Sequence, residues 1–396
     1  MKKGWQLKKL GDLCDVVGGG TPPKDKPAFY SGKIPWATVR DMRQEVITET
    51  EFRITKEAVQ SSATNIIPSG NVIIATRVGL GKVCLLGQDT AINQDLRGII
   101  PRDSKTLSIR FLFWWLKTMA DVIIAEGTGA TVQGVKLPFV KSLQIPIPPL
   151  AEQQRIVGVL DEAFAGLATA QANAEKNLQN ARALFESHLQ SVFADAWQSS
   201  EMVTLADLAT DITDGDHLPP PKAPTGVPFI TIGNIVKDTR QIDFSDTFMV
   251  PCSYFDALKP HKKPQKGDVL YTVTGSFGIP VIVTGDTEFC FQRHIGLVRP
   301  KQGIASTWLY YLLLSPQVFK QANEGANGAA QKTVSLKLLR SFIVPRVPTK
   351  KQEAVVAKLN ALATETQRLA SLYQQKLAAL AALKKSLLHQ AFSGEL

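Results

Sequence analysis

The sequence is poor in the residues that bind metals and form disulfides. It contains only five histidines and four cysteines, which are Cys14, Cys84, Cys252 and Cys290. None of the cysteines forms a Cys-x-x-Cys pair, and no histidine cluster lies near them, so the pattern predicts neither a metal site nor a disulfide framework. Scattered, reduced cysteines are typical of a reducing compartment, and we expect a cytoplasmic protein.

Long hydrophobic runs are also missing. Runs such as residues 111–116 are far short of the roughly 20 apolar residues that cross a bilayer as a helix. Residues 1–5 lack the apolar stretch that a signal peptide requires. The sequence therefore predicts no membrane partner.

The common reaction motifs are absent as well. A phosphate-binding loop needs Gly-x-x-x-x-Gly-Lys-Ser/Thr, and the one near candidate has Thr76 for the first glycine and Val83 at the end. The Asn/Asp-Pro-Pro-aromatic signature of adenine methyltransferases and the constellation of a metal-dependent nuclease are missing too. We therefore predict a chain that is not an enzyme and binds no cofactor or metal of its own.

What the sequence does have is positive charge. Its formal net charge is +10 and its pI is about 9.3 over 396 residues. An excess of this size favours a polyanionic partner, most simply nucleic acid. The alternative from charge alone is a basic protein with no such partner.

The sequence also contains an internal duplication. Pro146 and Pro149 are followed by a long helical pattern, and Pro345 and Pro348 recur 199 positions later with the same layout. Proline ends strands and is tolerated where a helix starts. Each proline pair therefore indicates a junction between a globular unit and a long helix, and two such junctions indicate a repeat.

We predict four segments from this pattern. They are a globular unit at 1–150, a long helix at 151–198, a second unit at 199–348 and a second long helix at 349–396. In the first unit, strand patterns are expected at 34–39, 70–76, 83–86, 90–94, 98–101 and 143–145, with a helix at 108–120 that begins at a serine cap, Ser108. The second unit repeats these features, with Gly296 matching Gly98, Ser306 matching Ser108 and Gly328-Ala329 matching Gly129-Ala130.

Both long helices carry a coiled-coil seam, in which apolar or small residues recur at alternating spacings of four and three. The first seam consists of Ile156, Leu160, Ala163, Leu167, Ala170, Ala174, Ala181 and Leu184, and the second of Val355, Leu359, Leu362, Leu369, Tyr373, Leu380, Leu383 and Leu387. Asn177, His188, Thr366 and Lys376 interrupt them. The predicted fold class is α+β: two strand-rich α/β units alternate with two long helices that pack as an antiparallel coiled coil, giving a pseudo-two-fold repeat.

Four stretches of the first half carry a family resemblance. They are Gly18-Gly19-Gly20-Thr21-Pro22, the segment 75–83 around Arg77 and Lys82, the segment 134–145, and the Pro-Pro-Leu-x-Glu-Gln stretch that ends at Val157. Together with the duplication, they resemble the specificity (S) subunit of type I restriction–modification systems over essentially the whole chain. The second junction departs from the family pattern, because Thr349 and Lys350 follow Pro348 and Lys351-Gln352 replaces Glu152-Gln153.

The resemblance implies a function and a set of partners. Each globular unit is expected to be a target-recognition domain that reads one half of a bipartite, asymmetric double-stranded DNA target, and the helix pair is expected to set the spacing. The expected protein partners are two modification (M) subunits and two restriction (R) subunits. S-adenosylmethionine, ATP and Mg²⁺ are expected on those partners and not on this chain. The alternatives are a coiled-coil adaptor that binds no nucleic acid, a stand-alone DNA-binding protein, and a stand-alone nuclease, which the missing motifs disfavour.

Cationic and small polar side chains near the loops are the candidate DNA contacts. Arginine pairs bidentately with guanine, and lysine neutralises phosphate. The candidates are Arg40, Arg43, Arg77, Lys82, Arg97 and Lys136 in the first unit, and Thr274, Ser276, Arg293, His294, Lys332 and Lys337 in the second. For each of them, a solvated surface charge or a turn residue is the alternative. Candidate residues for subunit docking are Pro148, Pro149, Glu152, Gln153, Pro348 and Gln352.

Overall fold

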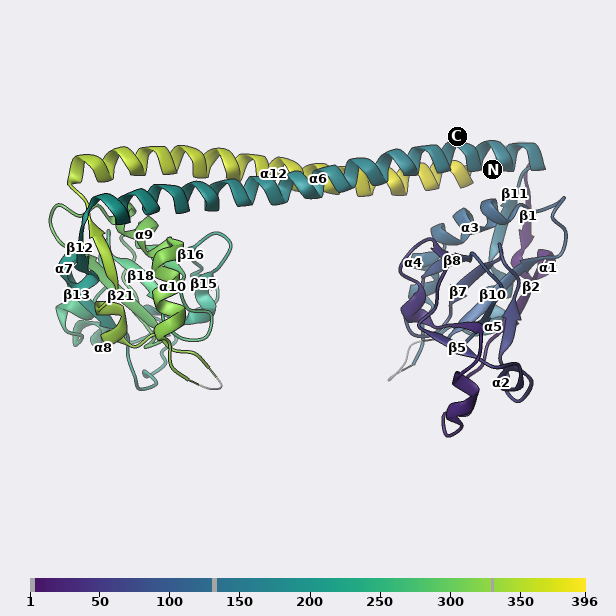
Figure 1. The fold of residues 1–396 in the computed structure, drawn as a ribbon, viewed down its shortest axis with the longest axis horizontal. Helices are drawn as coiled ribbons and strands as arrows, with labels where there is room; N and C mark the ends of the chain where they lie inside the picture. The colour runs from purple at the N-terminus through teal and green to yellow at the C-terminus, as the bar shows by residue number, and fades with distance from the viewer. Residues whose placement is uncertain (1–3, 130–133, 329–330) are drawn as a thin grey trace. The chain divides into compact units, whose positions relative to one another are not determined.

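The computed structural model describes residues 4–129, 134–328 and 331–396 (Figure 1). The chain divides into two compact units, Met1–Glu175 with Gln375–Leu396, and Lys176–Gln374. Two long helices, α6 (Leu150–Ser199) and α12 (Thr349–Ser393), each contribute one half to each unit. Among the described helices, none has an apolar stretch long enough to cross a membrane.

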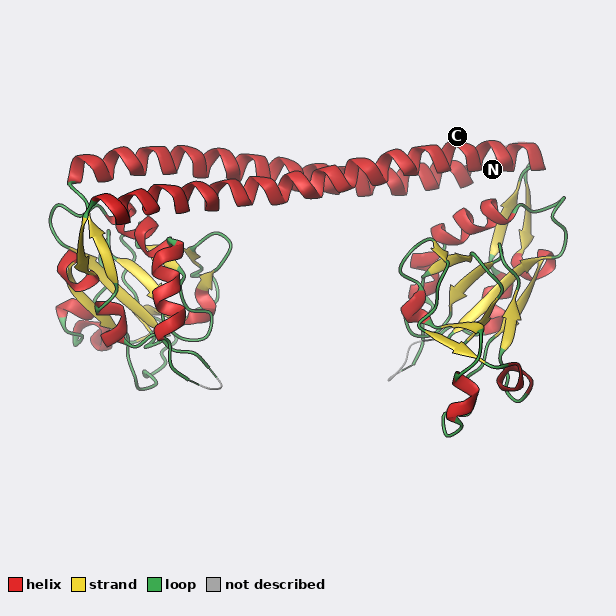
Figure 2. Cartoon of the chain, in the orientation of Figure 1, coloured by secondary structure: helices red, strands yellow, loops and turns green. Residues whose placement is uncertain are grey.

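The first unit is built on two main sheets (Figure 2). One sheet has the order β2-β10-β7-β8-β4, formed by Cys14–Gly18, Leu96–Pro101, Val72–Ala75, Val83–Leu86 and Val46–Ile47. The other has the order β5-β3-β9-β6, formed by Phe52–Ile54, Ile34–Ala37, Thr90–Ile92 and Asn65–Ile67. A two-stranded ribbon of β1 (Gln6–Lys9) and β11 (Gln144–Ile147) leads to the long helix.

Short helices complete the first unit. They are α1 (Leu10–Leu13), η1 (Pro27–Tyr30), η2 (Val39–Asp41), α2 (Lys56–Gln60), α3 (Ile109–Thr118), α4 (Ala120–Ala125) and α5 (Leu137–Ser142). The predicted helix at 108–120 is therefore two helices, which meet at Met119.

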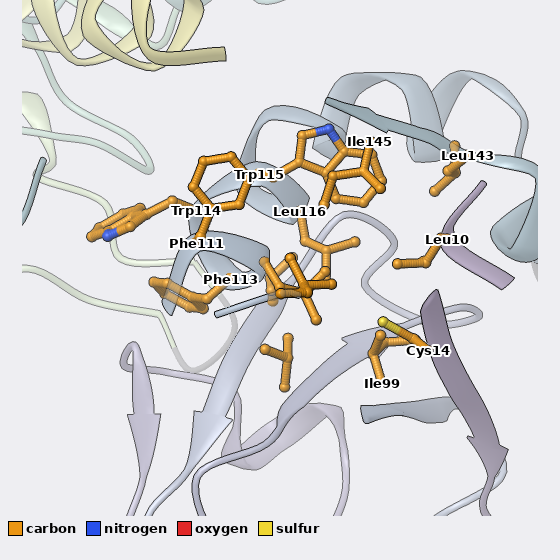
Figure 3. Packing of buried hydrophobic residues seen from close by; sticks show 14 of the residues in the cluster. Leu10, Cys14, Ile99, Phe111, Phe113, Trp114, Trp115, Leu116, Leu143 and Ile145 are labelled. Carbon is orange, nitrogen blue, oxygen red and sulfur yellow. The ribbon is translucent and has the colours of Figure 1, made fainter. Parts of the chain in front are cut away.

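Helix α3 forms the centre of the first core (Figure 3). Its aromatic residues Phe111, Phe113, Trp114 and Trp115 are all buried, because the helix lies between the sheet and the long helices. Strand β7 alternates its side chains between two cores: Val72 and Ile74 pack with α3, whereas Ile73 and Ala75 pack on the other face. A strand buried on both faces has a continuous apolar run in its sequence, as this one does.

The two long helices run antiparallel within this unit. Ile156, Leu160 and Phe164 of α6 share a core with Ala391 and Phe392 near the C-terminal end of α12. The rings of Phe111 and Phe392 lie 5.1 Å apart. The predicted antiparallel pairing is thus confirmed.

The second unit repeats the same plan. Its larger sheet has the order β13-β21-β18-β19, formed by Ala209–Asp214, Ile295–Pro300, Val269–Thr272 and Pro280–Ile282. The others are β17-β14-β20 (Phe248–Val250, Val227–Ile230, Cys290–Phe291), β15-β16 (Ile235–Val236, Gln241–Ile242) and the ribbon β12-β22 (Glu201–Thr204, Ile343–Arg346). Its helices are α7 (Leu205–Leu208), η3 (Ile232–Asn234), α8 (Cys252–Asp256), η4 (Pro260–Lys262), α9 (Ser306–Leu314), α10 (Pro316–Gly325) and α11 (Leu336–Arg340).

In this unit too, the long helices pack side by side and antiparallel. Leu189 and Phe193 of α6 share the core of α9 with Leu359 near the N-terminal end of α12. Phe193 lies 5.0 Å from Trp308 between ring centroids. The second unit therefore buries its half of the helix pair as the first one does.

The seam differs from its prediction at one equivalent pair of positions. Leu184 and Leu383, which are 199 positions apart, are 52% and 47% exposed. The buried line on α6 continues through Ala181, Leu189 and Phe193 instead, because an α-helix drifts from a strict seven-residue repeat. Thr366, expected as a break, stays buried because its hydroxyl donates to the carbonyl of Leu362 at 2.8 Å.

The first proline of each junction also differs from expectation. Pro146 and Pro345 lie inside strands β11 and β22, rather than ending them. Each strand belongs to a ribbon of only two strands. An edge strand tolerates proline because the missing N–H faces no neighbour.

Candidate nucleic-acid interface

Backbone hydrogen bonds fix which residues of the two units are equivalent. The Thr76 N–H donates to the Asp95 carbonyl at 2.8 Å, and the Val273 N–H donates to the His294 carbonyl at 2.9 Å. Strand register agrees, since Leu96 pairs with Ala75 as Ile295 pairs with Thr272. Gly296 therefore corresponds to Arg97, and the match of Gly296 to Gly98 is wrong by one residue. Comparing the two halves of the sequence missed this shift, because the glycines at 98 and 296 have similar neighbouring residues.

The loop after β7 is shaped by two glycines. Gly79 and Gly81 have φ of +74° and +82°, a region that favours glycine. A Cβ on Gly81 would lie 3.0 Å from Ile124 Cδ1 and 3.2 Å from the Ala120 carbonyl oxygen. The loop thus lies against α4, while Arg77 and Lys82 remain exposed.

Two arginines and one aspartate gather at the start of this loop. Arg77 Nη1 lies 3.7 Å from Asp95 Oδ1. Arg97 Nη1 donates to the carbonyls of Gln94 and Leu96 at 2.9 and 2.8 Å. Burial, and then the like charge of Arg77, lower the pKa of Arg97. The structure therefore brings Arg77 and Arg97 together as predicted candidates, with Arg97 partly used in holding the turn.

The other cations of the first unit lie on neighbouring loops. Arg40 is exposed and pairs with Glu51 at 3.5 Å, and Arg43 Nε donates to the Arg40 carbonyl at 2.9 Å. Val39, beside Arg40, is close to the loop, since a Cβ on Gly79 would lie 2.7 Å from its side chain. Lys136 is exposed at the start of α5, and the neighbouring Val135 N–H donates to the Thr76 carbonyl at 2.9 Å.

The corresponding loop of the second unit has a different chemistry. Thr274 stands where Arg77 does, but it is only 7% exposed. Ser276 is exposed, and its carbonyl accepts a hydrogen bond from the Thr272 hydroxyl at 2.8 Å. Thr274 also forms a β-bridge with Thr333, which places the segment around Thr333 beside this loop. The exposed hydroxyl on this loop is that of Ser276.

Further cations flank that loop. Arg293 is exposed and His294 half-buried in the turn before β21, where the first unit has Gln94 and Asp95. Lys332 is exposed and donates to Asn323 Oδ1 at 3.1 Å, and Lys337 is exposed on α11. The glycine-rich loops belong to the same regions: Gly129 and Gly328 have φ of +133° and +121°. The predicted loop residues Ala130, Thr131 and Ala329 lie outside the described residues.

A stacked aromatic pair was missed by the sequence analysis. Phe277 in the loop and Phe319 on α10 stack with centroids 5.8 Å apart at 17°, and Phe319 is 47% exposed. The equivalent positions in the first unit are the aliphatic Leu80 and Ile124. The only sequence signal for the pair was a phenylalanine in a glycine-flanked loop.

The junctions contain two buried glutamines with a shared role. Gln153 Nε2 donates to the carbonyls of Thr106 and Pro148, and its Oε1 accepts from the Ser108 N–H at 2.9 Å. Gln352 Nε2 donates to the carbonyls of Gly303 and Val347, and its Oε1 accepts from the Ala305 N–H at 3.0 Å. Both side chains are fully buried.

These contacts give the two glutamines a structural role. Gln153 and Gln352 are fully buried and bonded within the chain, and Pro148 is buried as well. Docking at these three residues stays a prediction. The same contacts correct one match between the two units. Ser108 and Ala305 are equivalent, rather than Ser108 and Ser306, and the Ser108 side chain makes no capping hydrogen bond.

The remaining junction residues reach the surface. Pro149 and Pro348 are exposed, and their carbonyls accept the first hydrogen bonds of α6 and α12. Glu152 is half-buried and receives two hydrogen bonds from Arg155, at 2.7 and 3.0 Å. Docking at Pro149, Pro348 and Glu152 stays a prediction.

Comparisons with known proteins point to one family. A family model described as the type I restriction modification DNA specificity domain matches residues 2–178 and 198–375. The chain is 34% identical over 164 residues to the EcoR124I/EcoR124II specificity subunit of Escherichia coli, covering 40% of each chain. It is 32% identical over 161 residues to the MjaIX specificity subunit of Methanocaldococcus jannaschii, covering 40% of this chain and 37% of that one. These two matches thus span well under half of each relative's length.

Other similarities cover the full length. The EcoKI specificity subunit of Escherichia coli (strain K12) is 22% identical over 428 aligned positions, covering 100% of this chain and 90% of that one. A chain from a structural study of the assembly of the type I R-M system has a TM-score of 0.81, with 21% identity and coverage of 100% and 99%. The HsdS subunit from Thermoanaerobacter tengcongensis has a TM-score of 0.62, with 21% identity and coverage of 100% and 98%. By its two matched domains and its fold, this chain belongs to the specificity-subunit family of type I restriction–modification systems.

Proposed function

We propose that this chain is the DNA specificity subunit of a type I restriction–modification complex, with each unit recognising one half of a bipartite, asymmetric target. The observation that carries the proposal is a repeated fold with different side chains at equivalent loop positions. Arg77, Asp95 and Arg97 in one unit correspond to Thr274, His294 and Gly296 in the other. Two units with the same fold but different loop side chains are suited to recognise two different half-sites on one DNA molecule.

Charge supports a nucleic-acid partner. A net charge of +10 with exposed cations around both loops favours binding to phosphate. Binding that neutralises several phosphates weakens steeply as salt rises. The absence of such salt-sensitive DNA binding would instead favour the coiled-coil adaptor.

The chain would supply sequence choice, and other subunits would supply chemistry. On this proposal two M subunits methylate adenine with S-adenosylmethionine, and two R subunits use ATP and Mg²⁺ for cleavage. The chain alone, given DNA and these three compounds, should therefore leave the DNA unchanged. Turnover by the purified chain would contradict the proposal and favour a stand-alone enzyme.

The long helices offer a repeated surface for the M subunits. Leu184 and Leu383 occupy equivalent positions and remain about half exposed, one in each unit. Exposed apolar side chains at related positions suit two copies of the same partner. We expect Leu383→Asp to lower the number of bound M subunits from two to one in native mass spectrometry, and Leu184→Asp to do the same. Two M subunits retained in both variants would place docking elsewhere.

Methylation mapping tests the proposed function directly. The chain is co-expressed with its candidate M subunit, and the host DNA is sequenced for N6-methyladenine. We expect one bipartite motif with a fixed gap, with half-sites about one helical turn apart, roughly 34 Å. A stable M–S complex without any methylated motif would argue against sequence recognition by this chain. Deleting one heptad from α6 should alter the tolerated gap or abolish methylation, and an unchanged gap would contradict a spacer role for the helices.

A further inference from the structure

The turn that precedes β10 is fixed from both sides. The Asp95 carbonyl accepts hydrogen bonds from the Thr76 N–H at 2.8 Å and from the Thr76 hydroxyl at 3.3 Å. The Asp95 N–H donates to Asn93 Oδ1 at 3.2 Å. Asn93 is itself buried, and its N–H donates to the Ala37 carbonyl at 3.0 Å. The backbone of Asp95 is therefore anchored to both sheets of the first unit.

The carboxylate of Asp95 is held as firmly as its backbone. Oδ2 accepts a hydrogen bond from Asn93 Nδ2 at 3.0 Å, which leaves Oδ1 directed at Arg77 Nη1, 3.7 Å away. The Asp95 side chain is only 16% exposed, whereas that of Arg77 is 47% exposed. The acid is thus the fixed member of the pair, and the guanidinium is the member that reaches the surface.

Arg97 adds a second constraint on the same guanidinium. It is half-buried and held by the carbonyls of Gln94 and Leu96, so its charge cannot move away. Its like charge disfavours an inward position of Arg77, while Asp95 keeps Arg77 from leaving the site. A planar guanidinium restrained in this way is prepared for bidentate pairing.

The hydrogen bond from Asn93 gives Asp95 a structural role, but folding stability does not explain its pairing with Arg77. An ion pair with one half-exposed partner contributes little to stability. A carboxylate beside a surface that binds DNA also repels phosphate. Its position is accounted for if it orients a side chain that recognises a base.

We propose that Asp95 is a positioning residue that orients the Arg77 guanidinium toward a guanine in the half-site read by the first unit. The inference rests on the proposed function, because it assumes that this loop faces DNA. The two acceptors of guanine in the major groove, O6 and N7, match the fork of one arginine. Recognition then comes from Arg77, and Asp95 acts through it.

The second unit lacks both members of the pair. His294 replaces Asp95 and Thr274 replaces Arg77, so donor and acceptor change together. Thr274 is also nearly buried. The Asp95–Arg77 pair is therefore specific to the first unit. Its loss should alter the base preference in one half-site only.

The test is selection of binding sites from a pool of random DNA duplexes by the full-length chain. The wild type should enrich one bipartite motif; failure to enrich any motif would count against the proposed function rather than against Asp95 alone. Asp95→Asn keeps the size and the acceptor for Asn93 but removes the charge. We expect it to reduce the preference for one guanine, in one half-site, by roughly tenfold or more. All other positions should be selected as before.

Two further variants make the outcome decisive. Arg77→Lys keeps the positive charge but loses the fork, and it should weaken the same guanine position. Asp15→Asn is the matched control, because it removes the negative charge that lies 2.8 Å from Arg102 at the other end of β10, and it should change no base preference. If the Asp95→Asn variant does not fold, the base preference of the Arg77→Lys variant alone tests the proposal. Unchanged base preference in Arg77→Lys, or in a folded Asp95→Asn, would overturn the proposal.

Discussion

Individual buried polar side chains hold the junctions of this molecule together. Gln153 and Gln352 tie the start of each long helix to the segment that precedes α3 or α9. Each amide uses its donor and acceptor groups inside the chain, where water cannot replace them. Such groups stabilise mainly because leaving their partners unsatisfied is costly.

Replacing Gln153 should therefore destabilise the first unit. Gln153→Ala leaves the Ser108 N–H and two carbonyls without a partner, and we expect a loss of about 1–3 kcal/mol in the free energy of unfolding. Urea unfolding followed by circular dichroism measures it. Gln154→Ala, at the exposed neighbouring position, should change stability by less than about 0.5 kcal/mol. Equal stability of the two variants would contradict the role of the buried amide.

The cysteines give a second residue-scale prediction. Burial raises the pKa of the Cys14 and Cys290 thiols to about 12 and that of Cys84 to about 11, whereas Cys252 is exposed. Because the thiolate is the reactive form, a raised pKa lowers reactivity at every pH below it. In the native protein at mildly alkaline pH, a thiol reagent such as DTNB should rapidly label one cysteine, the exposed Cys252. All four should react in concentrated guanidinium, and rapid labelling of two or more in the native state would contradict the cores described above.

At the scale of elements, the loops depend on glycine where the backbone turns into the left-handed region. Gly81 has φ of +82° and faces α4 closely, whereas Gly158 lies within α6, where an added Cβ would meet no other atom within 4 Å. The same substitution should thus have opposite effects in a loop and in a helix.

The two glycines form a matched pair for testing this. Gly81→Ala should cost about 1–2 kcal/mol, because the left-handed conformation disfavours a Cβ, and it should weaken DNA binding through the displaced loop. Gly158→Ala should stabilise by about 0.5–1 kcal/mol, because alanine is the better helix former. Thermal unfolding of both variants shows whether each substitution stabilises or destabilises the protein. Two shifts in the same direction would show that local backbone conformation does not control these sites.

At the scale of the whole molecule, the duplication has a functional consequence. Each compact unit has its own cores and its own half of the helix pair. If each unit reads one half-site, exchanging residues 1–145 for those of another family member should change one half of the methylated motif. Methylome sequencing of the co-expressed chimera with its M subunit checks this, and a change in both halves would contradict independent reading.

The repeat, the long helices and the family could be predicted from the sequence alone, because these depend on local patterns. Proline pairs, helical periodicity and strand-like apolar runs are set by neighbouring residues, and they recur 199 positions apart. Local patterns also placed cations on the loops. They could not say which of those cations is partnered, because the partners are distant in the chain.

Those pairings became visible in the folded chain. The register of β10 against β7 places Asp95 beside Arg77. The same register shows that Gly296 corresponds to Arg97 and not to Gly98. The tertiary structure also buried Gln153 and Gln352 in contacts within the chain, and the drift of α6 left Leu184 on its surface. Each result depends on which segments pack together, and packing is decided by the whole fold rather than by sequence spacing.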